Sequence, residues 1–165
     1  EDRALAEIAV RDSWPMVREA AISALWDRDV ARPVVRRGIR DRSARVRHAA
    51  IGAATRAGDR EAWPSIRARL ADSDEWPQVS VAALRYGRAV CLRDADAQSV
   101  AVVERGLAPE PWAPDIDVAA VAVDLAIRMG GELAERVTAM LQRPDAPPAM
   151  TQALTRAAAH ANSCR

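Results

Sequence analysis

The chain has 165 residues, of which 50% are hydrophobic and 28% are charged, and its formal net charge is +1. This length suits one ordinary domain with a sizeable core, and the small net charge excludes a protein that attracts polyanions through its overall charge. No apolar stretch is long enough to span a membrane, and two cysteines, Cys91 and Cys164, do not make a disulfide framework.

The residue types favour helices throughout the chain. Alanine, valine, leucine and isoleucine supply most of the apolar residues, whereas phenylalanine is absent and tyrosine occurs once. Alanine is the best helix former, and no segment alternates polar and apolar residues as a half-buried strand does. All 24 basic residues are arginines, so every cation is a planar, permanently charged group suited to carboxylates or phosphates. We therefore predict an all-α fold.

One short phrase recurs five times along the chain. Its apolar anchors, which are 29, 33, 37 and 34 residues apart, are Val17, Val46, Val79, Ile116 and Met150. A period in this range is typical of helical solenoids. We expect each copy to open the second helix of an antiparallel pair, with the first helix lying between the phrases.

Five such pairs are predicted in chain order. Their helices span residues 1–11 and 15–27, 31–41 and 43–57, 61–72 and 77–92, 96–108 and 114–129, and 132–143 and 147–162. Gly58, Gly106 and Gly130-Gly131 fall near predicted helix ends, where glycine commonly ends a helix. We expect a single repeat domain over residues 1–165, and we expect it to be a fragment or processed part of a longer chain, because no initiator methionine is present.

The start of each second helix has its own pattern. Four copies carry a proline, which suits the first helical turn: Pro15, Pro77, Pro114 and Pro148. Four copies have an aspartate three residues before this proline position, where a carboxylate can accept hydrogen bonds from unpaired backbone amides. These residues are Asp12, Asp41, Asp74 and Asp145. In the first copy the helical spacing predicts a core stripe of Val17, Ala20, Ala21, Ala24 and Leu25.

This pattern of a turn aspartate, a proline and then Val-Arg-x-Ala-Ala resembles the HEAT-repeat family, especially its short bacterial HEAT-like form. The first two copies match through Val17, Arg18, Val46 and Arg47, whereas the later copies have Ser80, Asp117 and Thr151 in place of the arginine. The resemblance implies a right-handed α-solenoid of about five helix pairs. It also implies a structural ladder between neighbouring repeats, formed here by Asp12, Arg18, Asp41 and Arg47.

The resemblance implies a scaffold whose second helices line a concave inner face that binds proteins. On that face we expect partner-binding residues at Arg45, His48, Arg56, Arg85, Arg88, Asp117 and Asp124, with Glu19 as a further charged residue. A protruding proline-rich loop could add a contact through Trp112. We expect the partner to be another protein or an adjacent domain of the parent chain.

An uneven charge distribution supports an alternative. Arginines outnumber acidic residues twelve to four within residues 28–69, and grouped on one face they could bind DNA or RNA. The opposing interpretation is an ion-paired helix surface without a ligand. The cluster comprises Arg36, Arg37, Arg40, Arg42, Arg45, Arg47, Arg56, Arg60, Arg67 and Arg69.

The tryptophans also allow two interpretations. Most lie close to a proline at a helix start, which predicts that they wedge between neighbouring repeats; the other possibility is an aromatic row that stacks bases or anchors a peptide. HEAT-like alkylpurine DNA glycosylases use tryptophan, aspartate and arginine on a basic surface, and Trp76, Arg85 and Asp124 offer these side chains without a specific motif. The five are Trp14, Trp26, Trp63, Trp76 and Trp112.

Nothing in the sequence indicates catalysis. His48 and His160 lack partners at metal-binding spacing, and no nucleophile elbow or phosphate-binding glycine loop occurs. We therefore predict a non-enzymatic, cytoplasmic protein-binding scaffold without metal or cofactor. The alternatives are a nucleic-acid-binding module and a purely structural spacer.

Overall fold

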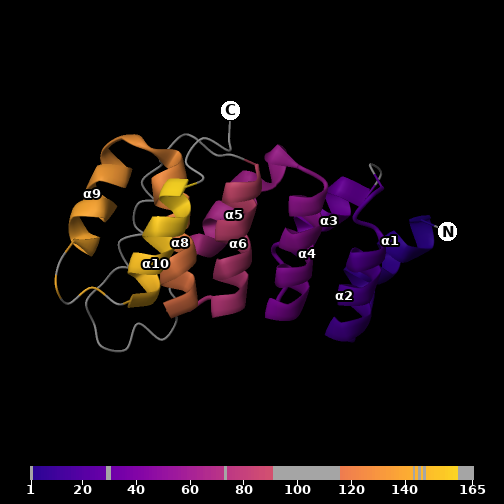
Figure 1. Cartoon of the computed structure of the whole chain (residues 1–165). Coiled ribbons are helices and arrows are strands. Elements are labelled where there is room, and N and C mark those ends of the chain that lie inside the picture. Colours follow the sequence, from indigo (N-terminus) through magenta and orange to yellow (C-terminus); the bar gives the residue numbers. More distant parts are fainter. Residues whose placement is uncertain are drawn as a thin grey trace. The chain divides into compact units, whose positions relative to one another are not determined.

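The computed structural model describes residues 2–28, 31–72, 74–90, 116–142, 144, 146 and 148–159. The chain divides into two compact units, unit 1 (Glu1–Val90) and unit 2 (Cys91–Arg165). Every regular element in the described residues is helical (Figure 1), so the prediction of an all-α fold is confirmed. None of the described helices is long and apolar enough to cross a membrane.

Unit 1 is an α-solenoid of three helix pairs. The second helices form one layer, in which α2 packs against α4 and α4 packs against α6, while the first helices α1 and α3 pack together (Figure 1). The single-turn helix η2 precedes α5. The elements are α1 (Asp2–Arg11), α2 (Pro15–Ala24), α3 (Arg32–Gly38), α4 (Ala44–Arg56), η2 (Arg60–Ala62), α5 (Trp63–Leu70) and α6 (Pro77–Ala89).

Unit 2 contributes three described helices. They are α8 (Ile116–Met129), α9 (Gly131–Leu141) and α10 (Pro148–Ala159). The second helices α8 and α10 pack together, as they do in unit 1, and α9 packs on α8. Gly130 and Gly131 have φ values of 74° and 62°, a left-handed conformation that glycine adopts at little cost, and they turn the chain between α8 and α9.

The predicted helices agree with these boundaries to within a few residues. Where described residues follow a helix, the largest differences are at α2, α3 and α6, each of which ends three residues before the predicted position. The predicted helix 96–108 lies outside the described residues. Prolines begin three of the second helices, as expected, because a proline in the first turn removes no helical hydrogen bond: Pro15, Pro77 and Pro148.

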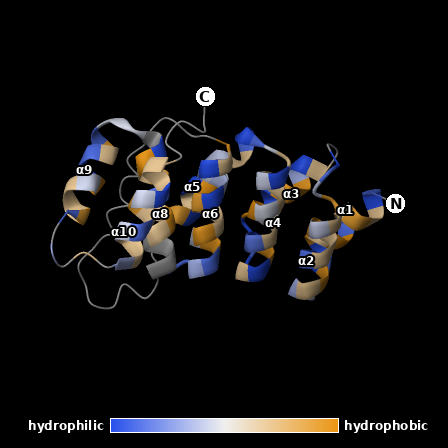
Figure 2. Ribbon diagram, viewed as in Figure 1, coloured by the Kyte–Doolittle hydropathy of each residue, from blue (hydrophilic) through white to orange (hydrophobic). Residues whose placement is uncertain are grey.

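The core of unit 1 lies between the two layers of helices. Each helix carries both hydrophobic and hydrophilic residues (Figure 2), and Ile22, Val46 and Val79 are fully buried. Gly38 at the end of α3 allows close approach, since a Cβ atom there would lie 2.6 Å from Cδ1 of Ile22 and 3.0 Å from Cβ of Ala50. Small residues therefore set the spacing between the layers.

The predicted core stripe of α2 is only partly correct. Ala21 and Leu25 are buried, but Val17 is 41% exposed and Ala20 and Ala24 are also exposed. The prediction was wrong for these three residues because it assumed that every repeat has a neighbour on both sides. α2 is the second helix of the first pair in unit 1. No described second helix packs on its outer side, which is the side turned away from α4.

The prediction that tryptophans wedge between repeats is wrong for two of them. Trp14 and Trp76 immediately precede α2 and α6, and they are 70% and 53% exposed. Trp63 does pack inside unit 1, where its ring stacks on Tyr86 with centroids 6.2 Å apart and planes at 9°. The starts of α2 and α6 therefore depend on backbone conformation and not on burial of these two tryptophans. Trp112 lies outside the described residues.

Candidate protein-interaction surface

Arg18 joins the first helix pair of unit 1 to the second. Its Nε and Nη2 donate to the two carboxylate oxygens of Asp41 at 2.9 and 2.7 Å, and its Nη1 donates to the carbonyl of Asp12 at 2.8 Å. Arg18 is only 3% exposed. One guanidinium therefore holds its own interhelix turn and the next one together, in the bidentate geometry that arginine prefers.

Arg47 makes the same contacts one repeat later. Its Nη1 donates to the carbonyl of Asp41 at 2.8 Å, and its Nε and Nη2 donate to the carboxylate of Glu75. The sequence pattern pointed to Asp74 at this turn, but Asp74 is exposed and the buried Glu75 accepts the arginine. A longer side chain one position later replaces the aspartate. The adjacent acidic pair Asp74-Glu75 was the available signal.

The turn carboxylates also hold the helix starts. Asp12 accepts the Trp14 amide and Asp41 accepts the Ser43 amide, each at 2.8 Å, whereas Glu75 accepts the Trp76 amide at the third turn. Burial raises the pKa of the Asp41 carboxyl, but hydrogen bonds from Arg18 and the Ser43 amide outweigh it, so this pKa lies below its ordinary value.

A second network around Asp59, which the sequence analysis missed, fixes the third helix pair. Arg36 donates to both carboxylate oxygens of Asp59 at 2.7 Å and to Glu61 at 2.7 Å, and the Tyr86 hydroxyl donates to the Asp59 carbonyl at 2.7 Å. The hydrogen bond from Arg36 lowers the pKa of Asp59 more than burial raises it. Burial, with a smaller contribution from the Asp59 charge, raises the pKa of Tyr86 to about 12.

The outward side of the second helices carries the expected partner-binding residues of unit 1. Arg45, His48 and Arg56 recur at helical spacing on α4 and are all exposed, and Arg85 and Arg88 are exposed on α6. We call this the second-helix surface, and it comprises Glu19, Arg45, His48, Arg56, Arg85 and Arg88. The structure thus brings the five basic residues onto two neighbouring helices.

The contacts within this surface are weak because they are partly exposed to solvent. Arg45 donates to Glu19 of α2 at 2.8 Å with 57% of its side chain exposed, so this pair contributes little to stability. The Arg56 guanidinium lies 5.4 Å from the ring centroid of Trp26, which is 41% exposed. Arg85 has no ion-pair partner among the described residues. These cations stay accessible, in contrast with the ladder arginines Arg18 and Arg47, whose side chains are 3% and 13% exposed.

The other expected contact residues do not join this group within unit 1. Asp124 lies on α8 in unit 2, where Arg128 of the same helix donates to its carboxylate at 3.2 Å. The side chain of Asp117 and all of Trp112 lie outside the described residues. Trp76 and Arg85 belong to unit 1 and Asp124 to unit 2, so no described contact unites the three residues named for a glycosylase.

Many arginines of the arginine-rich segment, residues 28–69, form hydrogen bonds or ion pairs with other residues of unit 1. Besides the ladder and the Asp59 network, Arg40 donates to the Ser65 hydroxyl at 2.9 Å and Arg60 to the Val90 carbonyl at 2.7 Å. Arg69 lies 3.6 Å from the Asp72 carboxylate. Much of the local positive charge therefore stabilises the solenoid rather than forming one basic face.

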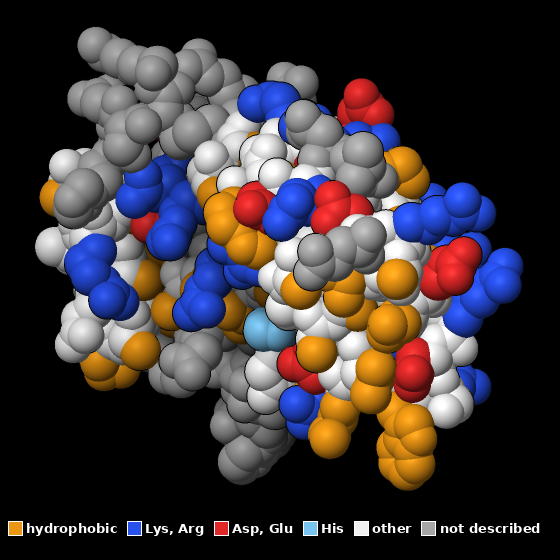
Figure 3. Space-filling view, turned by 90° about the vertical axis from the view of Figure 1, so that its right-hand side faces the viewer, with side chains coloured by type: hydrophobic (Ala, Val, Ile, Leu, Met, Phe, Trp, Pro, Cys, Tyr) orange, Lys and Arg blue, Asp and Glu red, His pale blue; other side chains and the backbone are white. Residues whose placement is uncertain are grey.

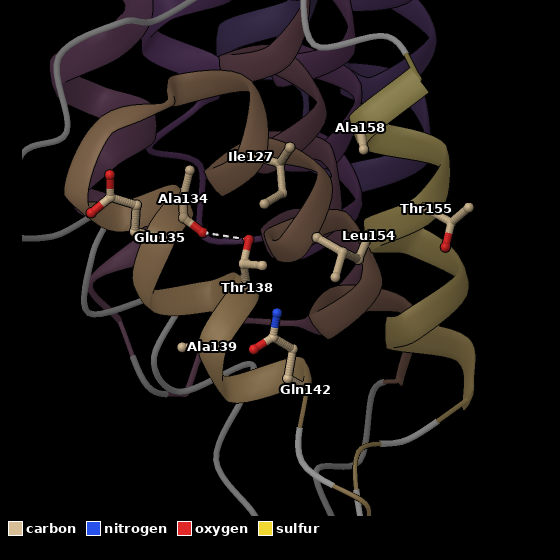
Figure 4. A pocket seen from close by; sticks show the side chains of 9 residues that line it. All are labelled: Ile127, Ala134, Glu135, Thr138, Ala139, Gln142, Leu154, Thr155 and Ala158. Carbon is tan, nitrogen blue, oxygen red and sulfur yellow. Dashed lines mark hydrogen bonds between the residues drawn. The ribbon is translucent and has the colours of Figure 1, made fainter.

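Unit 2 contains an apolar groove that the sequence analysis missed. It has a volume of about 740 Å³ and lies between α9 and α10 over α8 (Figure 4). Its lining includes Ile127, Leu154 and Thr138, whose hydroxyl is occupied by donating to the Ala134 carbonyl at 2.7 Å. The three helices are amphipathic in sequence, but their spacing could not be read from it.

Comparison with known proteins agrees with this geometry. No curated protein and no solved structure matches the chain. A family model for HEAT repeats matches residues 3–85, which is half of the chain and runs from α1 into α6, including the arginine ladder of unit 1. The chain therefore belongs to the HEAT-repeat family.

Proposed function

We propose that this protein is a non-enzymatic scaffold that binds an acidic segment of a partner protein, or of a neighbouring domain, on the second-helix surface. HEAT repeats generally serve as protein-interaction scaffolds and are typically non-enzymatic. The observation that carries the proposal is the division of the arginines into two groups. Arg18, Arg36 and Arg47, whose side chains are 3%, 28% and 13% exposed, each form a bidentate ion pair that joins neighbouring repeats, whereas the arginines on the outward side of α4 and α6 are exposed.

The chemistry of the second-helix surface supports an acidic partner. Arg45, Arg56, Arg85 and Arg88 are all cations, and the single acidic residue among them, Glu19, is already paired with Arg45. A partner carboxylate can displace Glu19 at small cost because exposed ion pairs are worth at most about 1 kcal/mol. Trp26 beside Arg56 adds an exposed aromatic ring, a residue type enriched at the centres of interfaces.

The test is selection of a displayed peptide library against the whole chain, followed by affinity measurements on the selected peptides. We expect acidic peptides that lose binding to Arg45→Glu/Arg56→Glu. The matched control is Arg3→Glu/Arg37→Glu, which reverses two exposed arginines on the first helices α1 and α3 and should bind like the original chain. Circular dichroism and the urea midpoint verify that each variant is folded.

Fluorescence anisotropy with labelled single- and double-stranded DNA tests the main alternative, which is a nucleic-acid-binding module. DNA binding that weakens steeply with salt and is lost in Arg45→Glu/Arg56→Glu would replace the proposal with the nucleic-acid alternative. Selected peptides that bind equally well to the folded charge-reversed variant would refute the assignment of this surface.

A further inference from the structure

The outer side of α2 has the residue pattern of an interface between repeats. Val17 corresponds to Val46 on α4 and Val79 on α6, and these two valines are fully buried whereas Val17 is 41% exposed. Ala24 is exposed, while the corresponding Ala53 is fully buried. Positions that are fully buried on the second helices α4 and α6 are therefore exposed on α2, which lacks a neighbouring second helix on one side among the described elements.

Further apolar side chains are exposed on α1 and at the start of α2. Ile8 is 38% exposed, Met16 is 64% exposed and Trp14 is 70% exposed. Figure 3 looks at the molecule from the α1–α2 end, and hydrophobic side chains form a row on the face that it shows. We call Ile8, Trp14, Met16, Val17, Ala20 and Ala24 the end face. A terminal repeat that caps a solenoid has a polar outer face, so this one does not have the character of a cap.

A charged group beside the end face points to a particular kind of partner. Asp12 and Asp41 are equivalent, because each accepts the amide two residues later at 2.8 Å. Asp41 also binds Arg18, the arginine of the preceding repeat. Among the described residues, no arginine side chain forms an ion pair with the Asp12 carboxylate. Asp12 is thus a ladder acceptor without its arginine.

We propose that the end face receives a further HEAT-type helix pair, placed ahead of α1 in the same polypeptide. The second helix of that pair packs on Val17, Ala20 and Ala24, and its ladder arginine binds Asp12. A single helix pair cannot bury its own apolar face, and covalent attachment supplies the high effective concentration that a small interface needs. This proposal concerns the end of the stack and is independent of the second-helix surface.

A second copy of the chain fits the end face less well. In a head-to-tail contact with unit 1, α6 would have to supply the ladder arginine, but Ser80 stands at that position. A two-fold symmetric contact would pair α2 with α2 of the second copy, whose Arg18 already binds Asp41 and so supplies no cation for Asp12.

The experiment extends the chain with a copy of its own first helix pair. A copy of residues 3–31 placed directly ahead of residue 3 keeps the 29-residue spacing between Val17 and Val46. Within the copy alone, Met16→Glu and Val17→Lys make the new end polar. Circular dichroism and the dependence of unfolding on urea report whether the added pair folds with unit 1.

Asp12→Asn then separates a ladder contact from a local role, because asparagine keeps the oxygen that accepts the Trp14 amide. We expect no measurable effect on the unfolding equilibrium of the original chain and a destabilisation of roughly tenfold or more in the extended chain. Arg18→Gln in the added copy should give the same loss, and the two changes together should add little. Asp41→Asn in the original chain is the matched reference.

An added pair that stays unfolded overturns the proposal, as does an Asp12→Asn effect of equal size in the original and extended chains. Sedimentation of the original chain is the final check. A dimer that disappears in Val17→Glu would show that a second copy covers the end face, and the proposal would then be wrong.

Discussion

Arg18 and Asp41 form a bidentate ion pair across the boundary between the first and second helix pairs, with N–O distances of 2.9 and 2.7 Å. Arg18 is almost completely buried, and its remaining nitrogen bonds the Asp12 carbonyl. Arg45 and Glu19 cross the same boundary at 2.8 Å, but 57% and 29% of their side chains are exposed. The two pairs have similar lengths and very different surroundings, which makes them a natural comparison.

Arg18→Met should therefore destabilise unit 1 by about 3 kcal/mol, because it leaves a partly buried carboxylate without its cation. Arg45→Met is the matched control and should cost less than about 1 kcal/mol, since exposed ion pairs contribute little. Urea unfolding followed by circular dichroism measures both. Equal costs for the two substitutions would contradict a structural role for the buried ladder.

Acid should weaken the fold through Asp41 and Asp59, whose pKa values both lie below their ordinary values. A lowered folded-state pKa contributes stability above the unfolded-state value of about 3.9, and this stability is lost as the pH falls through the folded-state pKa. The urea midpoint should thus drop below about pH 4. Asp41→Asn and Asp59→Asn should each flatten that decline, whereas Asp74→Asn, at an exposed site, should leave it unchanged.

Tyr86 should titrate with a pKa of about 12. It is the only tyrosine in the chain, so the ultraviolet absorbance of tyrosinate reports this single site. The chain has no lysine, so no lysine side chain titrates in the same pH range. Because its pKa is raised above the unfolded value of about 10, the stability it contributes is present below about pH 10 and is lost as the pH rises towards about 12. Tyr86→Phe should be less sensitive to pH in this window. Titration near pH 10 in the folded chain would contradict the burial of Tyr86.

Gly38→Ala tests the close approach of the two helix layers. The new methyl group would lie 2.6 Å from Cδ1 of Ile22, so we expect a net loss of about 1 kcal/mol despite the better helix propensity of alanine. Ile22→Val removes the clashing atom and should restore part of the loss in the double variant. Gly52→Ala is the control, because a Cβ atom there would lie 3.5 Å from Nη1 at the flexible end of Arg56. It should stabilise the chain slightly.

The repeat pattern was sufficient to predict the helices but not their surroundings. Val17 has the same local sequence as Val46, so periodicity placed both in the core, although only Val46 has a helix on its outer side. Trp14 was misassigned for a related reason, because a residue that precedes a helix-starting proline is fixed in backbone conformation and not in side-chain burial. Exposure at the end of a stack depends on neighbours that lie far away in sequence.

The ladder was predictable only where the motif is regular. Arg18 and Asp41 stand at the positions that the repeat pattern indicates, but Glu75 takes the role expected of Asp74, because the third turn shifts its acceptor by one residue. The Asp59 network joins residues more than twenty positions apart, and no local pattern links them. The outward arginines on α4 were predictable from helical spacing alone.

The contacts that join neighbouring helix pairs are unevenly distributed along unit 1. Arg36, Arg40 and Arg47 all reach from the second pair to the third, whereas Arg18, Arg45 and Arg56 join the first pair to the second and two of these contacts are exposed. When the solenoid is stretched along its axis, tension passes through these boundaries in series. The first boundary then resists that tension through apolar packing and the buried ion pair Arg18–Asp41, because the other two of these contacts are partly or largely exposed.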